Sequence, residues 1–498
     1  MRKTIGLLAV SVCTVWAGSA FAQGQIAPNP NPAGSTITLS SSGWFNNAIF
    51  DNRGTLDNIS GGTLNNTDTL DNNVGGALNN GGTLNNSSTL DNSGTITSLG
   101  TLDNFGTLNN KFGGTLNNLG SLDNNVGGTL SNDGTLDNFG TLANFGGGTL
   151  DNNGLLNNKG LLGNSGTLNN NLGGTLGNYG TLNNVGGFGG TLDNFGTLNN
   201  KFGGTLNNLG SLNNDVGGTL NNEGTLNNKF GGTLDNLDTL FNAGTLNNNF
   251  GGTLNNNVGG SLNNGGLLNN FGTLNNNLGG TLDNNGTLDN FGTLDNGGTL
   301  DNSGTITSTG TLNNKAGATM TLASGVVNAT TITNNGTFNL NGGALNVDTF
   351  NGNLDNTGGT LGAGNLSSFT TINGDYSQDA NSTLLIESLG VTGFGALSVS
   401  GTATLNGELK FVGSDYAGLA LGDSFDILIA NAIVGEFASV SNRTINEDWM
   451  WKLDYGLDGS SVTATVSAVP LPAAAWLFIS AIAGLAGAKR MSRSKASA

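Results

Sequence analysis

The sequence predicts an all-β protein whose body is a parallel β-helix (a β-solenoid), in which short strands stack coil upon coil. From Gly54 to Asn314 the chain repeats six- and eight-residue units of the pattern G-T-L-x-N, and the repeat Leu or Ile falls at 39 positions. Of the 38 intervals between these positions, 25 are six residues, 12 are eight and one is ten. Because side chains alternate between the two faces of a strand, even intervals keep every repeat Leu on one face, whereas a helical period would scatter them.

The composition excludes several classes of function. The 498 residues include no His and a single Cys, Cys13, so a Ser-His-Asp triad, His-ligated zinc and a disulfide framework are all excluded. Lys and Arg number 15 against 33 Asp and Glu, which gives a formal net charge of −18. Nucleic acid is not an expected partner, because neutralising phosphates requires many Lys and Arg residues.

Residues 1–22 are predicted to be a secretory signal peptide. Arg2 and Lys3 precede an apolar run over 5–16, and Ala20 and Ala22 form a small-x-small cleavage site. Cleavage there removes the lone Cys, so the mature chain has no thiol. The protein is therefore expected to be exported.

Residues 23–47 are predicted to form a leader and an N-terminal cap. The five prolines of the chain stand at 28, 30, 32, 470 and 472, all outside the repeats, which fits a hydrogen-bonded ladder that excludes Pro. We expect residues 23–35 to be a flexible leader. The aromatic residues Trp44, Phe45 and Phe50 are expected to cover the open edge of the first coil.

Residues 48–318 are predicted to be the regular solenoid, and their second repeated feature is an Asn two residues after the repeat Leu. It is present in 37 of the 39 units, and Ser98 and Ser308 replace it in the others. Asn tolerates a left-handed backbone, so we expect it where each short strand turns. Its amide both donates and accepts, so the asparagines of successive coils can form a ladder. The predicted structural ladder includes Asn58, Asn104, Asn110, Asn118, Asn194, Asn200 and Asn208.

Two features of the solenoid are less determined. Several phenylalanines lie between the ladder Asn and the next Gly, and filling of corners or gaps in the core is favoured over an aromatic binding stripe. They are Phe105, Phe112, Phe139, Phe145, Phe195 and Phe202. The number of units per coil stays open. Three units per turn would give 13 coils from the 39 units and, at about 4.8 Å per coil, a rod of roughly 60 Å.

Residues 319–369 are predicted to be less regular coils, and residues 370–468 to be conventional strands that form a C-terminal β cap. The residues that follow carry a resemblance: Gly374, Tyr376, Gln378, Ser382, Leu384, Gly401, Ala403, Leu405, Gly407 and Leu409. In these residues the segment resembles the C-terminal end of autotransporter passenger domains. That resemblance implies a β-helix whose last part caps the fold and helps it to fold. Trp449 and Trp451 are expected to close the core of the cap.

Residues 469–498 are predicted to be a sorting signal. Val469, Pro470, Leu471 and Pro472 precede an apolar run over 473–488. The predicted membrane helix and its basic tail include Trp476, Leu477, Phe478, Lys489 and Arg490. Cations that follow an apolar span favour a cytoplasmic tail, and the run is slightly shorter than the ~20 residues of a comfortable transmembrane helix.

The order of Pro motif, apolar helix and basic tail resembles the PEP-CTERM sorting signal of Gram-negative bacteria, although the family's central Glu is Leu471 here. The resemblance implies processing by an exosortase-type enzyme. It also implies a precursor tethered to the inner membrane, followed by a mature protein at the cell surface or outside the cell. The signal stands where autotransporters have a translocating barrel, so that second resemblance extends to fold and capping but not to the secretion route.

Asp often follows the repeat Leu, on the side of the strand that faces solvent. Asp283, Asp289, Asp295 and Asp301 lie in consecutive six-residue units and could form part of an acidic surface. Such a surface could hold calcium or an acid pair, but solubility is the favoured interpretation. No catalytic, cofactor-binding or metal-ligating residue is predicted, so an enzyme is not expected.

Thr before the repeat Leu and Asn or Asp after it both face outward, which gives regular columns of hydroxyl, amide and carboxylate groups. We expect a non-catalytic repeat protein of the cell surface or extracellular matrix, associated with exopolysaccharide, biofilm or adhesion. The family resemblance, not the repeat spacing, suggests polysaccharide as the partner. Alternatives are a purely structural rod, a glycan- or ice-binding module and, less favoured, a polysaccharide-active enzyme. Self-association through β-stacking also stays open.

Overall fold

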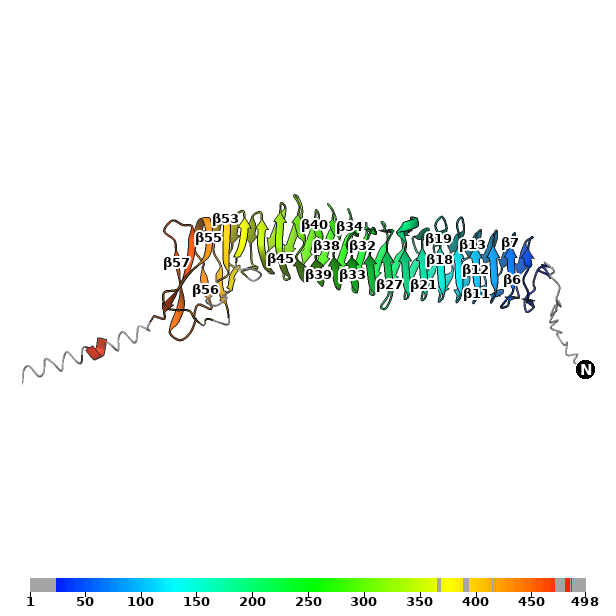
Figure 1. The fold of residues 1–498 in the computed structure, drawn as a ribbon, viewed down its shortest axis with the longest axis horizontal. Coiled ribbons are helices and arrows are strands. Elements are labelled where there is room, and N and C mark those ends of the chain that lie inside the picture. The colour runs from blue at the N-terminus through cyan, green and yellow to red at the C-terminus, as the bar shows by residue number, and fades with distance from the viewer. Residues whose placement is uncertain are drawn as a thin grey trace, which may run out of the picture.

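The computed structural model describes residues 24–364, 369–387, 394–413, 416, 418–470, 480–483 and 485. It is a long β-rod with its N-terminal coils at one end and a broader C-terminal cap at the other (Figure 1). The predicted signal peptide and most of the predicted sorting helix lie outside the described residues. Within the described part of the chain, no helix is both long and apolar enough to cross a membrane.

The rod is the predicted parallel β-helix, and it has three strands in each coil. Each strand of the repeats pairs in parallel with the strand three positions later: β12 (Thr101–Asn104) pairs with β15 (Ser121–Asn124), which pairs with β18 (Thr141–Asn144). These pairs keep the repeats in register, with Leu102 beside Leu122 and Leu122 beside Leu142. The structure thereby determines the coil size that the sequence leaves open.

Every strand from β5 (Thr55–Asn58) to β43 (Thr311–Asn314) is four residues long, starting one residue before a repeat Leu or Ile. Three faces result. Face A holds every third strand from β5, face B every third strand from β6 (Thr63–Asn66), and face C every third strand from β7 (Thr69–Asn72). A 3₁₀ turn, Gly186–Phe188, lies in the one ten-residue unit. The strands before the repeats are β1 (Gly24–Gln25), β2 (Thr36–Leu39), β3 (Trp44–Asn46) and β4 (Phe50–Asn52).

The core is built from the repeat leucines, each at most 1% exposed, stacked in three columns. A single Leu in each strand buries little apolar area by itself, but each coil covers the leucines of the next. The ladder asparagines, two residues on, point to the same side and are equally buried. Residues one before and one after each Leu face outward, as strand alternation predicts.

Two kinds of glycine shape the corners. In a six-residue unit the coils approach so closely that a Cβ at Gly140 would overlap the carbonyl oxygen of Gly120 in the coil before. In an eight-residue unit the longer turn contains a second Gly with a left-handed backbone, such as Gly113 at φ 82°. Only the second kind needs the conformational freedom of Gly; the first needs the missing side chain.

The N-terminal leader is not flexible, contrary to the expectation for residues 23–35. The described residues from Gly24 onward pack on the first coil, and buried Asn31 starts one ladder by donating to Asn52 Oδ1 at 2.7 Å. Phe50 is fully buried and Trp44 packs against the core, as expected of cap residues. A leader that supplies ladder and core contacts loses its freedom because the open edge of the first coil binds it.

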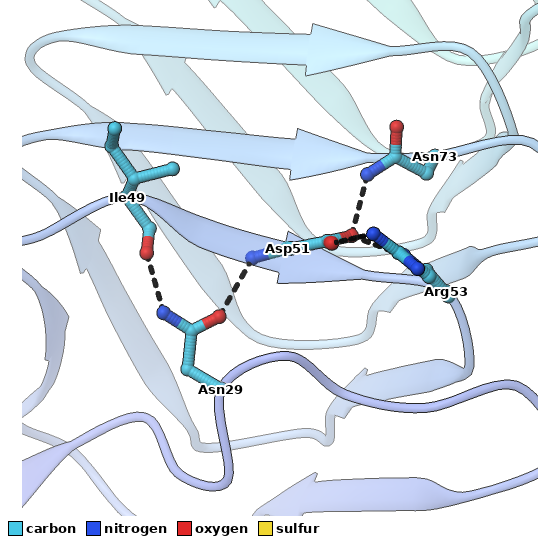
Figure 2. A network of polar contacts seen from close by, with 5 residues as sticks. All are labelled: Asn29, Ile49, Asp51, Arg53 and Asn73. Carbon is cyan, nitrogen blue, oxygen red and sulfur yellow. Dashed lines mark hydrogen bonds and ion pairs between the residues drawn. The ribbon is translucent and has the colours of Figure 1, made fainter.

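A polar network at this end ties the leader to the first two coils (Figure 2). Asn29 donates from its amide to the carbonyl oxygen of Ile49 and accepts from the backbone N–H of Asp51 at 3.0 Å. The Asp51 carboxylate accepts from the amide of Asn73 at 2.6 Å and forms an ion pair with Arg53 at 2.6 Å. These side chains therefore make part of the hydrogen bonds that a neighbouring coil would otherwise make with the open edge of the first coil.

The less regular coils continue the parallel helix further than predicted. Parallel pairing runs through to the pair β54–β56, and only the last strands are antiparallel, where β58 lies between β55 and β57. The segment after residue 370 is therefore mostly more solenoid, with an antiparallel end. The strands after β43 are β44 (Thr319–Leu322), β45 (Val326–Asn334), β46 (Thr337–Leu340), β47 (Ala344–Asn351), β48 (Leu354–Asn356), β49 (Thr360–Ala363), β50 (Phe369–Asn373), β51 (Tyr376–Gln378), β52 (Thr383–Glu387), β53 (Ala396–Leu405), β54 (Glu408–Val412), β55 (Ser424–Gly435), β56 (Ser439–Ser441), β57 (Trp449–Tyr455) and β58 (Ser461–Ala468).

Aromatic side chains close the C-terminal end. Trp451 is fully buried and stacks near Phe411, with ring centroids 5.4 Å apart, while Phe394 meets it edge-on at 4.9 Å. Trp449 is partly buried and packs against the same cluster. Both tryptophans thus lie in the core of the cap, and the large rings replace the leucines that a further coil would supply.

Candidate binding surface

The ladder asparagines form continuous hydrogen-bonded columns inside the corners. Each buried amide donates to the Asn one coil on and also to the backbone carbonyl that starts the following strand. Asn104, for example, donates to Asn124 Oδ1 and to the Thr129 carbonyl oxygen, both at 2.8 Å. The same pair of bonds is made by Asn58, Asn110, Asn118, Asn194, Asn200 and Asn208.

The backbone of these asparagines differs from the expectation. They are the last residues of extended strands, and among the described residues Asn442 is the non-glycine residue with a positive φ. The reason is that Asn is needed for its buried amide, which bridges coils, and not for a left-handed turn. Its place at an even offset from Leu directs the side chain into the core.

The two Ser substitutions interrupt the columns. Ser98 accepts from Asn80 at 3.1 Å, but its hydroxyl points to the Gly100 carbonyl oxygen at 3.5 Å and not to the next coil. As a result the buried Oδ1 of Asn118, which lies beside Ser98, has no partner. The ladder is therefore directional, and each member depends on the amide one coil before it.

The six phenylalanines are on the surface, so the expectation that they fill the core is wrong. Their exposed fractions range from 39% to 91%. Phe105 follows Leu102 by three residues, and an odd offset points a side chain away from the core. Phe112 and Phe202 lie in eight-residue turns, at an even offset, but there the chain has left the strand. The outward direction of Phe105 could therefore be predicted from the sequence, because it follows from the odd offset.

The consecutive Asp residues do not form one acidic surface, because consecutive units lie on different faces. Asp283 and Asp301 are neighbours on face A, while Asp289 is on face B and Asp295 is on face C. Six residues along the chain move to the next face, and only about 20 return to the same one. Within the described residues no group of three or more acidic, His or Cys side chains is arranged to hold a metal ion.

On face C, Asp and Asn alternate along much of the rod and bond to one another. Asn109 donates to Asp91 at 2.7 Å, and Asn213 donates to Asp193 at 2.7 Å. The alternation separates the carboxylates by two coils. On the other two faces like charges meet in successive coils. On face B, burial and then the neighbouring Asp123 raise the pKa of Asp103. Burial and then Asp301 do the same to the pKa of Asp283.

Face B contains a different surface, with no charge at its outward positions from β18 (Thr141–Asn144) to β36 (Leu267–Asn270). Its centre consists of the identical strands β24 (Thr181–Asn184), β27 (Thr205–Asn208), β30 (Thr225–Asn228) and β33 (Thr245–Asn248). We call their outward side chains the neutral grid: Thr181, Asn183, Thr205, Asn207, Thr225, Asn227, Thr245 and Asn247. The sequence shows the residues but not that they share a face, because three strands per coil must be known first.

The neutral grid presents hydrogen-bonding groups at a regular spacing. Asn227 donates to Asn207 Oδ1 at 2.9 Å, and Asn247 donates to Asn227 Oδ1 at 2.8 Å. Each such amide has two donors and two acceptor sites, so one bond given and one received leave one of each for a ligand. The half-buried Thr residues lie two positions before these asparagines in each strand, and they too are in register from coil to coil. At the corner before the grid, Lys201 and Glu223 neutralise one another at 3.0 Å.

The predicted sorting motif is described only in part. Val469 is 38% exposed, and its backbone N–H donates to the Asp448 carbonyl oxygen at 2.8 Å, directly after β58. Pro470 follows it, exposed. The other predicted signal residues lie outside the described part of the chain: Ala20, Ala22, Leu471, Pro472, Trp476, Leu477, Phe478, Lys489 and Arg490.

Comparisons with known proteins assign the chain to no family. No protein-family model and no curated protein matches the chain. Among solved structures, the chain is similar to a TibA fragment (55–350), hyper-glycosylated by TibC, at 14% identity and a TM-score of 0.16. The match covers 74% of this chain and 100% of that chain. An identity and a TM-score this low support no inference about activity or partner.

Proposed function

We propose that the protein is an exported, non-catalytic rod of the cell surface or extracellular matrix that binds neutral polysaccharide along face B. The observation that carries the proposal is the neutral grid. Hydroxyl and amide groups in register, with free donors and acceptors in every coil, can bond to the hydroxyls of a sugar chain laid along the rod. A long array of weak contacts suits a polymer ligand, because each bond adds little and the repeats add up.

Charge favours a neutral polymer over an acidic one. The chain has a net charge of −18, and the grid lacks a cluster of cations that could pair with carboxylate or sulfate groups. An anionic polysaccharide would therefore meet repulsion from the rod without local compensation. A neutral polymer has no charge for the rod to repel.

Export and sorting are part of the proposal and rest on the terminal signals. The predicted motif at residues 469–472 begins one residue after the last strand of the cap, and Val469 and Pro470 are exposed. Processing there by an exosortase-type enzyme would leave the solenoid and its cap intact. The helix over 473–488 would tether the precursor to the inner membrane before processing.

The test is the affinity of the purified full-length protein for a soluble neutral β-glucan, measured by co-sedimentation. The triple change Asn207→Asp, Asn227→Asp and Asn247→Asp puts charge on the grid and removes amide donors. We expect it to weaken binding about tenfold or more, since buried or unmatched polar groups at a binding surface are costly. The isosteric change Thr225→Val, which adds no charge, should weaken binding in the same direction.

The matched control places the same charges on face A. Asn199, Asn221 and Asn263 occupy the equivalent outward position there, so changing all three to Asp also adds three negative charges. We expect this control to bind the glucan like the wild type. Equal loss in the two triple variants would show that net charge and not the grid governs binding, and would contradict the proposal.

Ice is the second candidate, and the same surface favours it. The acidic residues that the sequence places along the repeats do not interrupt this part of face B. Thermal hysteresis of the dilute protein, lost with Thr225→Val, would assign the grid to ice. Glucan binding without thermal hysteresis would assign it to sugar.

A further inference from the structure

A row of exposed apolar side chains lies along one corner of the rod, where face B passes into face C. It occupies five consecutive coils, after strands β27, β30, β33, β36 and β39 (Thr287–Asn290). We call it the apolar ridge: Leu209, Phe230, Phe250, Phe271 and Phe291, with exposed fractions of 37%, 74%, 78%, 44% and 48%. A contiguous exposed row of this kind marks an interaction surface, since isolated exposed apolar residues are common but continuous rows are not.

The ridge is ordered by contacts between coils. The rings of Phe271 and Phe291 stack at a centroid distance of 4.8 Å with an interplanar angle of 9°. The ring of Phe230 covers Gly251 of the next coil, and the two turns are joined by a bond from the Gly231 N–H to the Gly251 carbonyl oxygen at 3.1 Å. The side chains therefore form a regular edge with the period of the coils.

We propose that the apolar ridge is the interface of a lateral homodimer, in which a second copy of this chain packs antiparallel along the same corner. Spacing favours this occupant, because another copy presents apolar side chains at the same interval by construction. A two-fold axis at Phe250 places Phe230 opposite Phe271 and Leu209 opposite Phe291. The interface is then self-complementary and closed, as in most homodimers.

Area and charge agree with this occupant. With large apolar side chains that bury roughly 150–250 Å² each, five that are about half exposed offer about 500 Å² per copy. Two copies reach the ~1,000 Å² that a specific interface requires, before polar flanks are counted. The charged side chain at the ridge is Lys229, whose flexible stem can turn its ammonium to solvent. Carboxylates lie on the flanking strands and not in the ridge turns: Asp289 is on face B, and Asp235 and Asp295 are on face C.

The other two corners also expose apolar side chains. Where face C passes into face A these are Leu172, Phe195, Val216, Val258 and Leu278, at 39–81% exposed, but one of the five is aromatic, against four of five in the ridge. Where face A passes into face B the row is shorter. Leu119 and Phe139 are exposed in successive coils after face A strands, but the next coil presents Lys159, whose Nζ lies 4.4 Å from the centre of the Phe139 ring. That ring already has a cation on its face. The ridge beside face B has no such cover within the described residues.

The experiment is sedimentation velocity of the purified full-length protein over a concentration series. We expect a monomer–dimer equilibrium whose dissociation constant rises about tenfold or more in the double variant Phe230→Ser and Phe250→Ser. Phe112→Ser is the matched control. Residues 109–116 and 227–234 have the same sequence, NNKFGGTL, so Phe112 and Phe230 have the same neighbours along the chain. Phe112 is 91% exposed and lies on a different corner. Phe112→Ser should leave the constant unchanged.

A second measurement locates the contact. Asn249→Cys places a thiol beside Phe250, next to the proposed two-fold axis, and should form an intermolecular disulfide under mild oxidation. Asn285→Cys, on another corner, should not. A wild type that stays monomeric, or a dimer that Phe112→Ser weakens as much as the ridge variant, would overturn the proposal. So would a monomer whose ridge binds the neutral β-glucan or phosphatidylcholine vesicles and loses that binding in the ridge variant.

Discussion

Replacing Asn228 by Ala should open the solenoid locally, because this residue is a link in a buried ladder. Its amide donates to Asn248 Oδ1 and to the Thr253 carbonyl oxygen, both at 2.8 Å, and accepts from Asn208 at 2.9 Å. The variant loses the two donated bonds and the accepted one, at about 1 kcal/mol each, and leaves the buried Asn248 Oδ1 without a partner at a further 1–3 kcal/mol. The expected destabilisation is about 4–6 kcal/mol.

Hydrogen exchange of the full-length protein measures this effect where it occurs. In a quasi-one-dimensional fold each coil contacts only its neighbours, so protection should fall by about three to four decades in β27, β30 and β33 and little in distant coils. The control is Asn227→Ala, the adjacent residue, whose amide makes its bond to Asn207 on the surface. Water can replace that bond, so the control should lose less than about 1 kcal/mol. Equal loss of protection in the two variants would refute the account of the buried ladder.

Two further predictions follow from the ladder and from the acidic pairs. Ser98→Asn should stabilise the protein by about 1 kcal/mol in chemical denaturation, because the new amide can donate to the unpaired Asn118 Oδ1; Ser308→Asn, whose neighbour one coil on is Ala329, should gain nothing. Asp301→Asn should lower the pKa of Asp283 in an NMR titration by removing the neighbouring charge, while burial, the larger cause, still raises it. A carboxyl whose pKa is raised in the folded state adds stability at low pH, and this stability is lost as the pH rises from the unfolded value of 3.8 through the folded pKa. Asp301→Asn should reduce that loss. Asp289→Asn, on face B, should leave the pKa of Asp283 unchanged.

The strand alternation was predictable from the sequence because it depends on parity alone. Even intervals between leucines, and Asn at an even offset, direct both residues inward whatever the coil size. The neighbours of each residue in space were not predictable, since near-identical units allow two, three or more strands per coil. That single unknown explains why Asp283, Asp289 and Asp295 were placed together when they lie on three faces.

The ends of the rod depended on tertiary contacts that local patterns do not carry. The proline-containing leader reads as flexible, yet Asn31 joins the buried ladder and Asn29 bonds across the first coil edge. At the other end, the alternation after residue 370 suits a conventional sheet as well as longer coils, and parallel pairing up to β56 selects the coils. Parity alone directs Phe105, Phe139, Phe145 and Phe195 outward, three residues after a repeat Leu, whereas Phe112 and Phe202 lie in turns where strand parity does not apply.

The most direct test of the proposed function is the salt and calcium dependence of glucan binding by the full-length protein. A neutral grid predicts retention of the β-glucan that is unchanged from about 50 to 500 mM salt and in the presence of a calcium chelator, because no charge pairing is screened. Retention that appears only with calcium would assign binding to the Asp residues. Retention that falls steeply with salt, or no retention under any condition, would contradict polysaccharide binding through the neutral grid.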